Sequence, residues 1–296
     1  MRRLNTLMTR LGLYLLRWIG RRPLPRARVM TRWLARPMRW CMRNRARIAQ
    51  RNLELCFPEL DDNARKTLHR QHFTLLAESL GEIAFAWNDQ NQLDASFGEV
   101  LGLEHLNQAR ANEHGVLLVT GHTTSLELSA RLLAETAPLV GVYRPLKNQL
   151  LESFQNAGRS YAKGMLPRHD IRAMIRHLRA GHIVWTAMDQ DFGPKRSIFA
   201  PFFGIRTATA RGLLDLARLG NARVVPVYAF KDTQSGRITI EVEPAFESFP
   251  SGDPLADLGQ YNRFIENAIR RAPAQYWWLH RRFKTAPDDE APRYRC

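Results

Sequence analysis

After about residue 93, short runs of apolar residues alternate along the chain with segments in which apolar residues recur at helical spacing. The run "VLLVT" at 116–120 is apolar up to its last residue, which is typical of a strand buried on both faces of a sheet. A helix is predicted from about Ser125 to Glu135. Further strands are predicted at 138–144, 182–191, 223–232 and 236–246, and further helices at 148–159, 172–181, 209–220 and 261–273. The last two strands are expected to pair across the turn "TQSG", and the alternation as a whole predicts an α/β layer fold.

Helical spacing also dominates the part of the chain before this alternation. Pro58 is expected to end one helix, and Asp61 or Asp62 is expected to cap the next. The apolar positions between residues 64 and 87 then predict a long helix, or a helix pair, that covers the sheet. The segment "IFAPFFG" at 198–204 is apolar but resembles a loop, since Pro201 and Gly204 interrupt it.

The first fifty residues have the pattern of amphipathic helices. Apolar side chains recur at helical spacing from Leu4 to Trp18, while Arg3, Arg10 and Arg17 fall on a different face. A second helix is expected from about Ala27, with a bend at Pro37. The longest apolar stretch is far shorter than the roughly twenty residues that cross a bilayer. It is not followed by a clear cleavage site, so a secretory signal is not expected.

The charge of the chain is concentrated in the same fifty residues. Fifteen arginines precede the first acidic residue, Glu54, and they account for nearly all of the formal net charge of +16. Such a basic segment favours nucleic acid or an anionic membrane as its partner. Trp18, Trp33 and Trp40 are typical of helices in the headgroup layer, and no nucleic-acid motif is present. We therefore predict membrane-associating helices at 1–50 and a single α/β domain at 51–296; ordinary packing on the body and nucleic-acid binding are the alternatives.

His122 lies between the strand at 116–120 and the helix that follows it. In open α/β sheets the carboxyl ends of strands are where ligands bind. Glu127 comes five residues later and could hold one imidazole nitrogen, so that the other takes a proton from a substrate hydroxyl. A turn histidine, or a metal ligand acting with Asp189 or Asp191, is the alternative. The spacing alone is weak, and no metal-binding motif accompanies it; the three widely spaced cysteines likewise indicate neither zinc nor a disulfide framework.

Several blocks, taken together and in order, resemble the lipid A late acyltransferases, the bacterial enzymes that add secondary acyl chains to lipid A. They are "GHTTSLELSARLL", "VYRPLKN", "GMLPRHDIRAMIRHLRAG", "AMDQDFGPKRSIFAPFFG", "TATARG" and "APAQYWWLHRRFKT". The resemblance implies the αβα sandwich of glycerolipid acyltransferases. It also implies work at the cytoplasmic face of the inner membrane, without metal or organic cofactor. The acyl donor would be an acyl carrier protein thioester, and the acceptor a hydroxyl on a 3-hydroxyacyl chain of a lipid A precursor.

The same resemblance implies roles for particular residues. The catalytic motif of the family maps onto His122 and Glu127, so that His122 is expected to be the general base with help from Glu127. Arg159 would grip a lipid A phosphate or hold the catalytic carboxylate. Of Asp189 and Asp191, one is expected to face the site and the other to make structural bonds. Lys195 and Arg196 are cations suited to sugar phosphates or to an acidic carrier protein.

Two other functions remain open at this point. One is a related acyltransferase that acts on another phospholipid or glycolipid by the same mechanism. The other is a non-catalytic membrane-binding or nucleic-acid-binding protein, whose binding to DNA would fall steeply with salt.

Overall fold

A computed structural model describes residues 2–88, 93, 97–111 and 114–294, with the side chains of residues 2–5 excluded. The helices are α1 (Arg2–Gly20), α2 (Leu24–Arg32), α3 (Ala35–Cys41), α4 (Arg43–Cys56), α5 (Asp62–Ala86), α6 (Leu103–Ala109), α7 (Leu126–Ala134), α8 (Gln149–Gly158), α9 (Ile171–Arg179), α10 (Gly212–Gly220) and α11 (Pro254–Arg271). The strands are β1 (Gly98–Leu101), β2 (Gly115–Thr120), β3 (Leu139–Tyr143), β4 (Gly164–Pro167), β5 (Ile183–Ala187), β6 (Ser197–Phe202), β7 (Ile205–Ala210), β8 (Ala222–Lys231) and β9 (Ile238–Val242).

A mostly parallel sheet runs through the centre of the protein, as the alternation of strands and helices predicted. Its seven strands have the order β1-β9-β8-β2-β5-β3-β4, and only the β8–β9 pair is antiparallel. The expected pairing of the last two strands across "TQSG" is thereby confirmed. Strand β2 lies in the middle, between β8 and β5, and each of its residues is buried. The carboxyl ends of β2 and β5 therefore meet at the same edge of the sheet.

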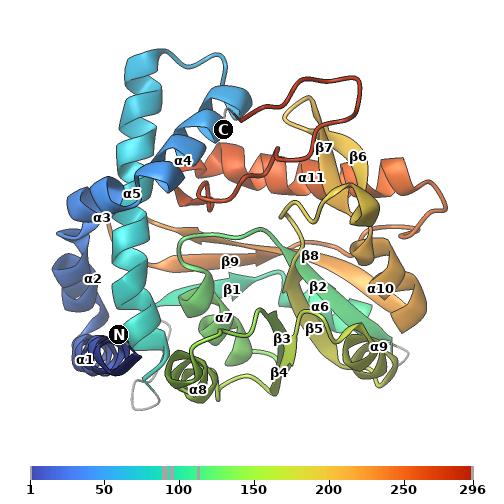
Figure 1. Cartoon of the computed structure of the whole chain (residues 1–296). Coiled ribbons are helices and arrows are strands. Elements are labelled where there is room, and N and C mark those ends of the chain that lie inside the picture. Colours follow the sequence, from blue (N-terminus) through green and yellow to red (C-terminus); the bar gives the residue numbers. More distant parts are fainter. Residues whose placement is uncertain (1, 89–92, 94–96, 112–113, 295–296) are drawn as a thin grey trace.

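Helices cover both faces of this sheet (Figure 1). Successive side chains of β2 point to opposite faces, so Leu117 and Val119 join one core while Val116 and Leu118 join the other. The first core contains residues of α4, α5, α9, α10 and α11, and the second contains residues of α6 and α7. A strand buried on both faces has no polar side to alternate with, which explains the continuous apolar run.

The long helix α5 confirms the prediction for residues 64–87 as one helix. It begins where the Asp61 side chain accepts a hydrogen bond of 2.7 Å from the backbone N–H of Ala64, which is the predicted cap. Helices α1 to α4 pack along α5, and the boundary that we predicted at residue 50 falls inside α4. At the α2–α5 contact, Arg28 is buried and donates to Glu82 at 2.8 Å.

Two local predictions were wrong. The apolar segment 198–204 is not a loop but lies in the hairpin of β6 and β7, whose two-residue turn places Phe203 at φ 51° and Gly204 at φ 72°. A phenylalanine is unusual at positive φ, so the turn had no clear signal. The second basic helix does not bend at Pro37 but ends near Trp33, because a proline cannot donate to the carbonyl four residues earlier.

Candidate functional site

His122 follows the last residue of β2 by two positions, and Asp189 follows the last residue of β5 by two. Because the two strands are parallel neighbours, both side chains reach the same edge of the sheet. The Nδ1 atom of His122 lies 2.5 Å from Oδ1 of Asp189, and the backbone N–H of His122 donates to Oδ2 at 3.0 Å. The carboxylate thus holds both the ring and the backbone of the histidine.

The electrostatics of this pair follow from burial and charge. Asp189 is 1% exposed, whereas the side chain of His122 is 26% exposed. Burial by itself lowers the pKa of His122, but the neighbouring Asp189 carboxylate outweighs it, so that the pKa is raised above the ordinary histidine value. Burial by itself raises the pKa of Asp189, and the imidazole opposes this and holds that pKa far below its usual range. The imidazole is therefore a strengthened base, and the carboxylate leaves its Nε2 nitrogen uncontacted.

The expected contact between His122 and Glu127 is absent from the hydrogen bonds of the described residues. Helix α7 begins at Leu126, and Glu127 in its first turn faces the ends of α5 and α8 instead. Its Oε2 accepts hydrogen bonds from Trp87 Nε1 at 2.8 Å and from Arg159 Nε at 3.1 Å. Arg159 Nη2 donates to the other oxygen, so the ion pair is bidentate. Asp189 therefore has the place beside the imidazole that we predicted for Glu127.

Arg159 holds a carboxylate, one of its two predicted roles. It follows α8, and its guanidinium lies 5.8 Å from the centre of the Trp87 ring and 5.7 Å from that of Tyr143. Burial by itself lowers the pKa of Arg159, but Glu127 outweighs this and raises it. The pair with Glu127 is mostly buried, so the two charges compensate each other away from water.

Asp191 has the structural role that we expected of one aspartate in this block. Its carboxylate accepts from the backbone N–H of Thr285 at 2.7 Å, from the Thr285 hydroxyl at 2.9 Å and from the N–H of Gly193 at 2.8 Å. The loop then continues into the short helix η2 (Pro194–Arg196), where Lys195 and Arg196 are exposed. These two cations are close to the site in sequence, but they are not part of the histidine–aspartate pair.

The C-terminal segment contributes to the site in a way that the sequence did not indicate. The backbone N–H of Trp277 donates to the carbonyl of His122 at 3.0 Å, and that of Thr124 donates to the carbonyl of Gln275 at 2.8 Å. The ring centre of His280 lies 6.4 Å from that of His122, and burial lowers the pKa of His280 to about 4. A neutral His280 thus adds no positive charge beside the base.

Two further residues escaped prediction. The hydroxyl of Tyr261, on α11, donates to the Thr120 carbonyl at 2.8 Å and accepts from the Met188 N–H at 3.1 Å, and so ties the exits of β2 and β5 together. Gln190 places its Nε2 atom 3.3 Å from the Nε2 atom of His122. Neither contact has a signal in the sequence, because each joins segments that are tens of residues apart.

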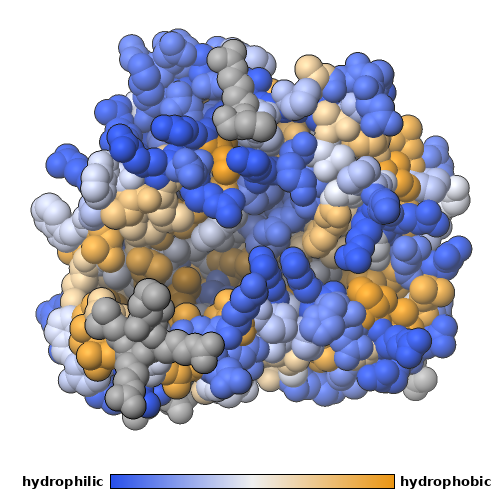
Figure 2. Space-filling model, in the orientation of Figure 1, coloured by the Kyte–Doolittle hydropathy of each residue, from blue (hydrophilic) through white to orange (hydrophobic). Residues whose placement is uncertain are grey.

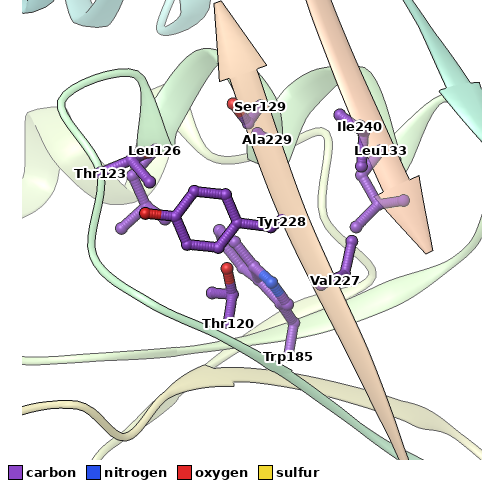
Figure 3. A pocket seen from close by; sticks show the side chains of 10 residues that line it. All are labelled: Thr120, Thr123, Leu126, Ser129, Leu133, Trp185, Val227, Tyr228, Ala229 and Ile240. Carbon is purple, nitrogen blue, oxygen red and sulfur yellow. The ribbon is translucent and has the colours of Figure 1, made fainter. Parts of the chain in front are cut away.

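A small cavity lies behind the loop of His122, between β2, α7, β8 and β9 (Figure 3). The ring of Tyr228 crosses it, with its hydroxyl toward Thr123 and with Trp185 beside it. Among the described residues, Thr123 Oγ1, Trp185 Nε1 and Tyr228 Oη have no hydrogen-bond partner. The remaining lining is largely apolar, so the cavity backs the site without supplying a charged group.

Apolar side chains are exposed on the N-terminal helices. They gather at the left of Figure 2, over α1, α2 and α3, and the surface is hollowed beside them. The most exposed are Leu7, Met8, Leu11, Tyr14, Val29, Trp33 and Trp40, and Trp33 is 82% exposed. No helix in the described part of the chain is both long enough and apolar enough to span a membrane. Nor do the described residues contain a group of three or more histidines, cysteines and acidic residues that could hold a metal ion.

Comparison with known proteins agrees with the blocks found in the sequence. The family described as "Bacterial lipid A biosynthesis acyltransferase" matches residues 1–285. The chain is 38% identical to a lipid A biosynthesis lauroyltransferase of Escherichia coli (strain K12) over 255 residues, which cover 86% of this chain and 83% of the relative. It is 36% identical to the lipid A biosynthesis palmitoleoyltransferase of the same strain over 263 residues, or 88% and 85% of the two chains. A myristoyltransferase of that strain is 27% identical over 250 residues, or 82% and 76% of the two chains.

Proposed function

This chain belongs to the bacterial lipid A biosynthesis acyltransferases, and from that premise we propose that it moves a fatty acyl chain from acyl carrier protein to a hydroxyl on a 3-hydroxyacyl chain of a lipid A precursor. It is an acyltransferase of lipid A biosynthesis; the donor, the acceptor hydroxyl and the mechanism are the proposal. The observation that carries the mechanism is the hydrogen bond between His122 Nδ1 and Asp189. That bond leaves Nε2 as the only ring nitrogen able to accept a proton.

In the proposed reaction His122 is the general base. Nε2 takes the proton of the acceptor hydroxyl while its oxygen attacks the thioester carbonyl carbon. The tetrahedral intermediate then expels the thiolate of the carrier, which receives the proton back from Nε2. Asp189 keeps the Nδ1 proton in place and stabilises the imidazolium, which is the task of the carboxylate in such pairs. General-base help of this kind contributes roughly 100- to 10,000-fold.

Glu127 and Arg159 have a different task in this proposal. Their ion pair, packed against Trp87 and Tyr143, forms a rigid wall that orients the substrate beside the base. The charge of Arg159 is mostly buried and already compensated by Glu127, although its Nη1 atom has no hydrogen-bond partner among the described residues. The exposed Lys195 and Arg196 suit the anionic groups of the substrates better, namely a lipid phosphate or the surface of the carrier protein.

The site faces an anionic membrane in this proposal. The exposed apolar residues of α1, α2 and α3 would enter the headgroup layer of the inner membrane from its cytoplasmic face. The arginines between them would then contact lipid phosphates. An acceptor anchored in the bilayer could reach the site while its sugar headgroup remained in water.

The test uses the purified full-length chain, membranes that contain the lipid A precursor, and a mixture of acyl carrier protein thioesters of different length. We expect one new lipid whose mass exceeds that of the precursor by a single acyl group, and at least a 1,000-fold loss of its formation in His122→Ala. Near-native activity of His122→Ala would end the mechanism. A product formed equally well in membranes without the lipid A precursor would favour the related acyltransferase that acts on another lipid.

A further inference from the structure

Gln190 lies between the two aspartates that anchor its loop. Asp189 makes two hydrogen bonds to His122, and Asp191 makes two to Thr285, so the backbone on either side of Gln190 is fixed. Its side chain is only partly buried and turns toward the imidazole, with 3.3 Å between the two Nε2 atoms. The mechanism proposed above uses Asp189, and Asp191 anchors the loop, but neither role explains this contact.

The protonation state of the histidine determines what the contact means. Nδ1 faces a carboxylate, which can only accept, so Nδ1 carries the hydrogen of the neutral ring. Nε2 therefore presents a lone pair, and the amide N–H of Gln190 donates to it. That lone pair is the same one that must take the proton of the acceptor hydroxyl. Gln190 thus stands, in the free enzyme, where the hydroxyl must bind.

We propose that Gln190 is a catalytic residue whose amide N–H is displaced from His122 by the acceptor hydroxyl and then donates to the thioester oxyanion. This inference rests on the proposed acyl transfer with His122 as base. The hydroxyl oxygen takes the position beside Nε2 and bonds to the carbonyl carbon, so the oxyanion forms two bonds away from that oxygen. A donor that reached Nε2 needs only a side-chain rotation to reach the oxyanion. The carbonyl electron pair moves onto that oxygen as the new bond forms, and it returns when the thiolate leaves.

The electrostatic consequence separates this role from a structural one. A donor on the Nε2 lone pair stabilises the neutral imidazole, so it lowers the pKa of His122. Gln190→Ala removes that donor, and the pKa of His122 should rise. Because the base works only when neutral, the acidic limb of kcat/KM should move to higher pH. Gln190→Glu should move it further, since a carboxylate stabilises the imidazolium.

Loss of an oxyanion donor should appear in kcat rather than in KM. We expect Gln190→Ala and Gln190→Glu to lower kcat by roughly 100- to 1,000-fold, with KM for both substrates changed less than threefold. Gln190→Asn retains the amide on a side chain that is one methylene group shorter. It should therefore have a higher kcat than Gln190→Ala and a lower kcat than the wild type. The matched control is Gln108→Glu, on the exposed face of α6, which should leave kcat and the pH profile unchanged.

The decisive experiment combines steady-state kinetics of the full-length chain with an NMR titration of its histidines, in which His122→Ala identifies the His122 signal. A lower kcat together with a higher pKa of His122 in Gln190→Ala supports the inference. A kcat within threefold of wild type, or a lower kcat with an unchanged pKa of His122, overturns it. If Gln190→Ala fails to fold, the same two readings on Gln190→Glu, which keeps the length of the side chain but lacks the N–H donor, decide. An active His122→Ala enzyme would instead refute the proposed base, which is a separate failure.

Discussion

At the residue scale, the partner of the imidazole is determined by which strand lies beside β2. Asp189 is 67 positions away from His122 along the chain, yet adjacent parallel strands bring the two together. Glu127 is only five positions away, yet the turn before α7 directs it to Trp87 and Arg159. Proximity in sequence was therefore a poor guide to which acid contacts the imidazole. A change at Asp189 should accordingly affect the chemistry more directly than a change at Glu127.

Asp189→Asn tests the role of the carboxylate. The charge of Asp189 raises the pKa of His122, so its removal should lower that pKa and move the acidic limb of kcat/KM to lower pH. The maximal kcat should nevertheless fall by about 100- to 10,000-fold, because the weaker base is no longer held in the required tautomer. Initial rates measured across the pH range check both effects.

Asp288→Asn, at an exposed position, is the control and should leave the pH profile as it is. A limb that moved to higher pH in Asp189→Asn would contradict the electrostatic role assigned to that carboxylate.

At the element scale, a buried ion network holds the N-terminal helices to the sheet. Lys231, at the end of β8, donates to Glu78 at 3.0 Å and to Glu82 at 2.8 Å, both on α5. Arg28 of α2 reaches the same Glu82 and also the carbonyl of Gly236 at 2.7 Å. Because these groups are buried, each charge depends on its partners. The helices that expose apolar residues are thus fixed to the rest of the protein by buried charges.

Lys231→Met should lower the free energy of unfolding by about 3–5 kcal/mol, since it leaves buried carboxylates with one cation fewer. Denaturant unfolding of the full-length chain measures the difference. The matched control is Lys66→Met, at an exposed position of α5, which should change stability by less than about 0.5 kcal/mol. A loss below about 1 kcal/mol in Lys231→Met would mean that the network contributes little to holding α2 and α5 on the sheet.

At the scale of the whole molecule, the N-terminal helices combine exposed apolar side chains with arginines that account for nearly all of the formal net charge of +16. Fifteen arginines lie before Glu54, while Trp33 and Trp40 are 82% and 68% exposed on the same segment. This combination of arginines and exposed apolar side chains fits a lipid headgroup layer, in which anionic groups lie directly above apolar chains. A nucleic acid would satisfy the charge but not the apolar side chains.

Replacing both Trp33 and Trp40 with serine should weaken binding to anionic vesicles at least tenfold, because less apolar area enters the interface. Vesicle flotation at several salt concentrations measures this, and higher salt should weaken binding of the wild type as well. Trp277→Ser, in the C-terminal segment beside His122, is a control for loss of a tryptophan elsewhere. Equal flotation of the double variant and the wild type would exclude these two residues as the membrane contact. Tight binding of the wild type to DNA, without binding to vesicles, would favour the nucleic-acid alternative.

The sequence by itself determined the features that depend on local pattern. The buried run at 116–120, the alternation of strands and helices, the Asp61 cap and the position of His122 at a strand exit follow from periodicity and from residues close together in the chain. Ordered blocks spread over the chain were sufficient to identify the family. Only the tertiary structure decided which acid lies beside the imidazole, that Arg159 is paired with Glu127, and that Gln190 occupies the free nitrogen. These contacts depend on strand order and on the direction of each loop, which long-range packing sets and local spacing does not encode.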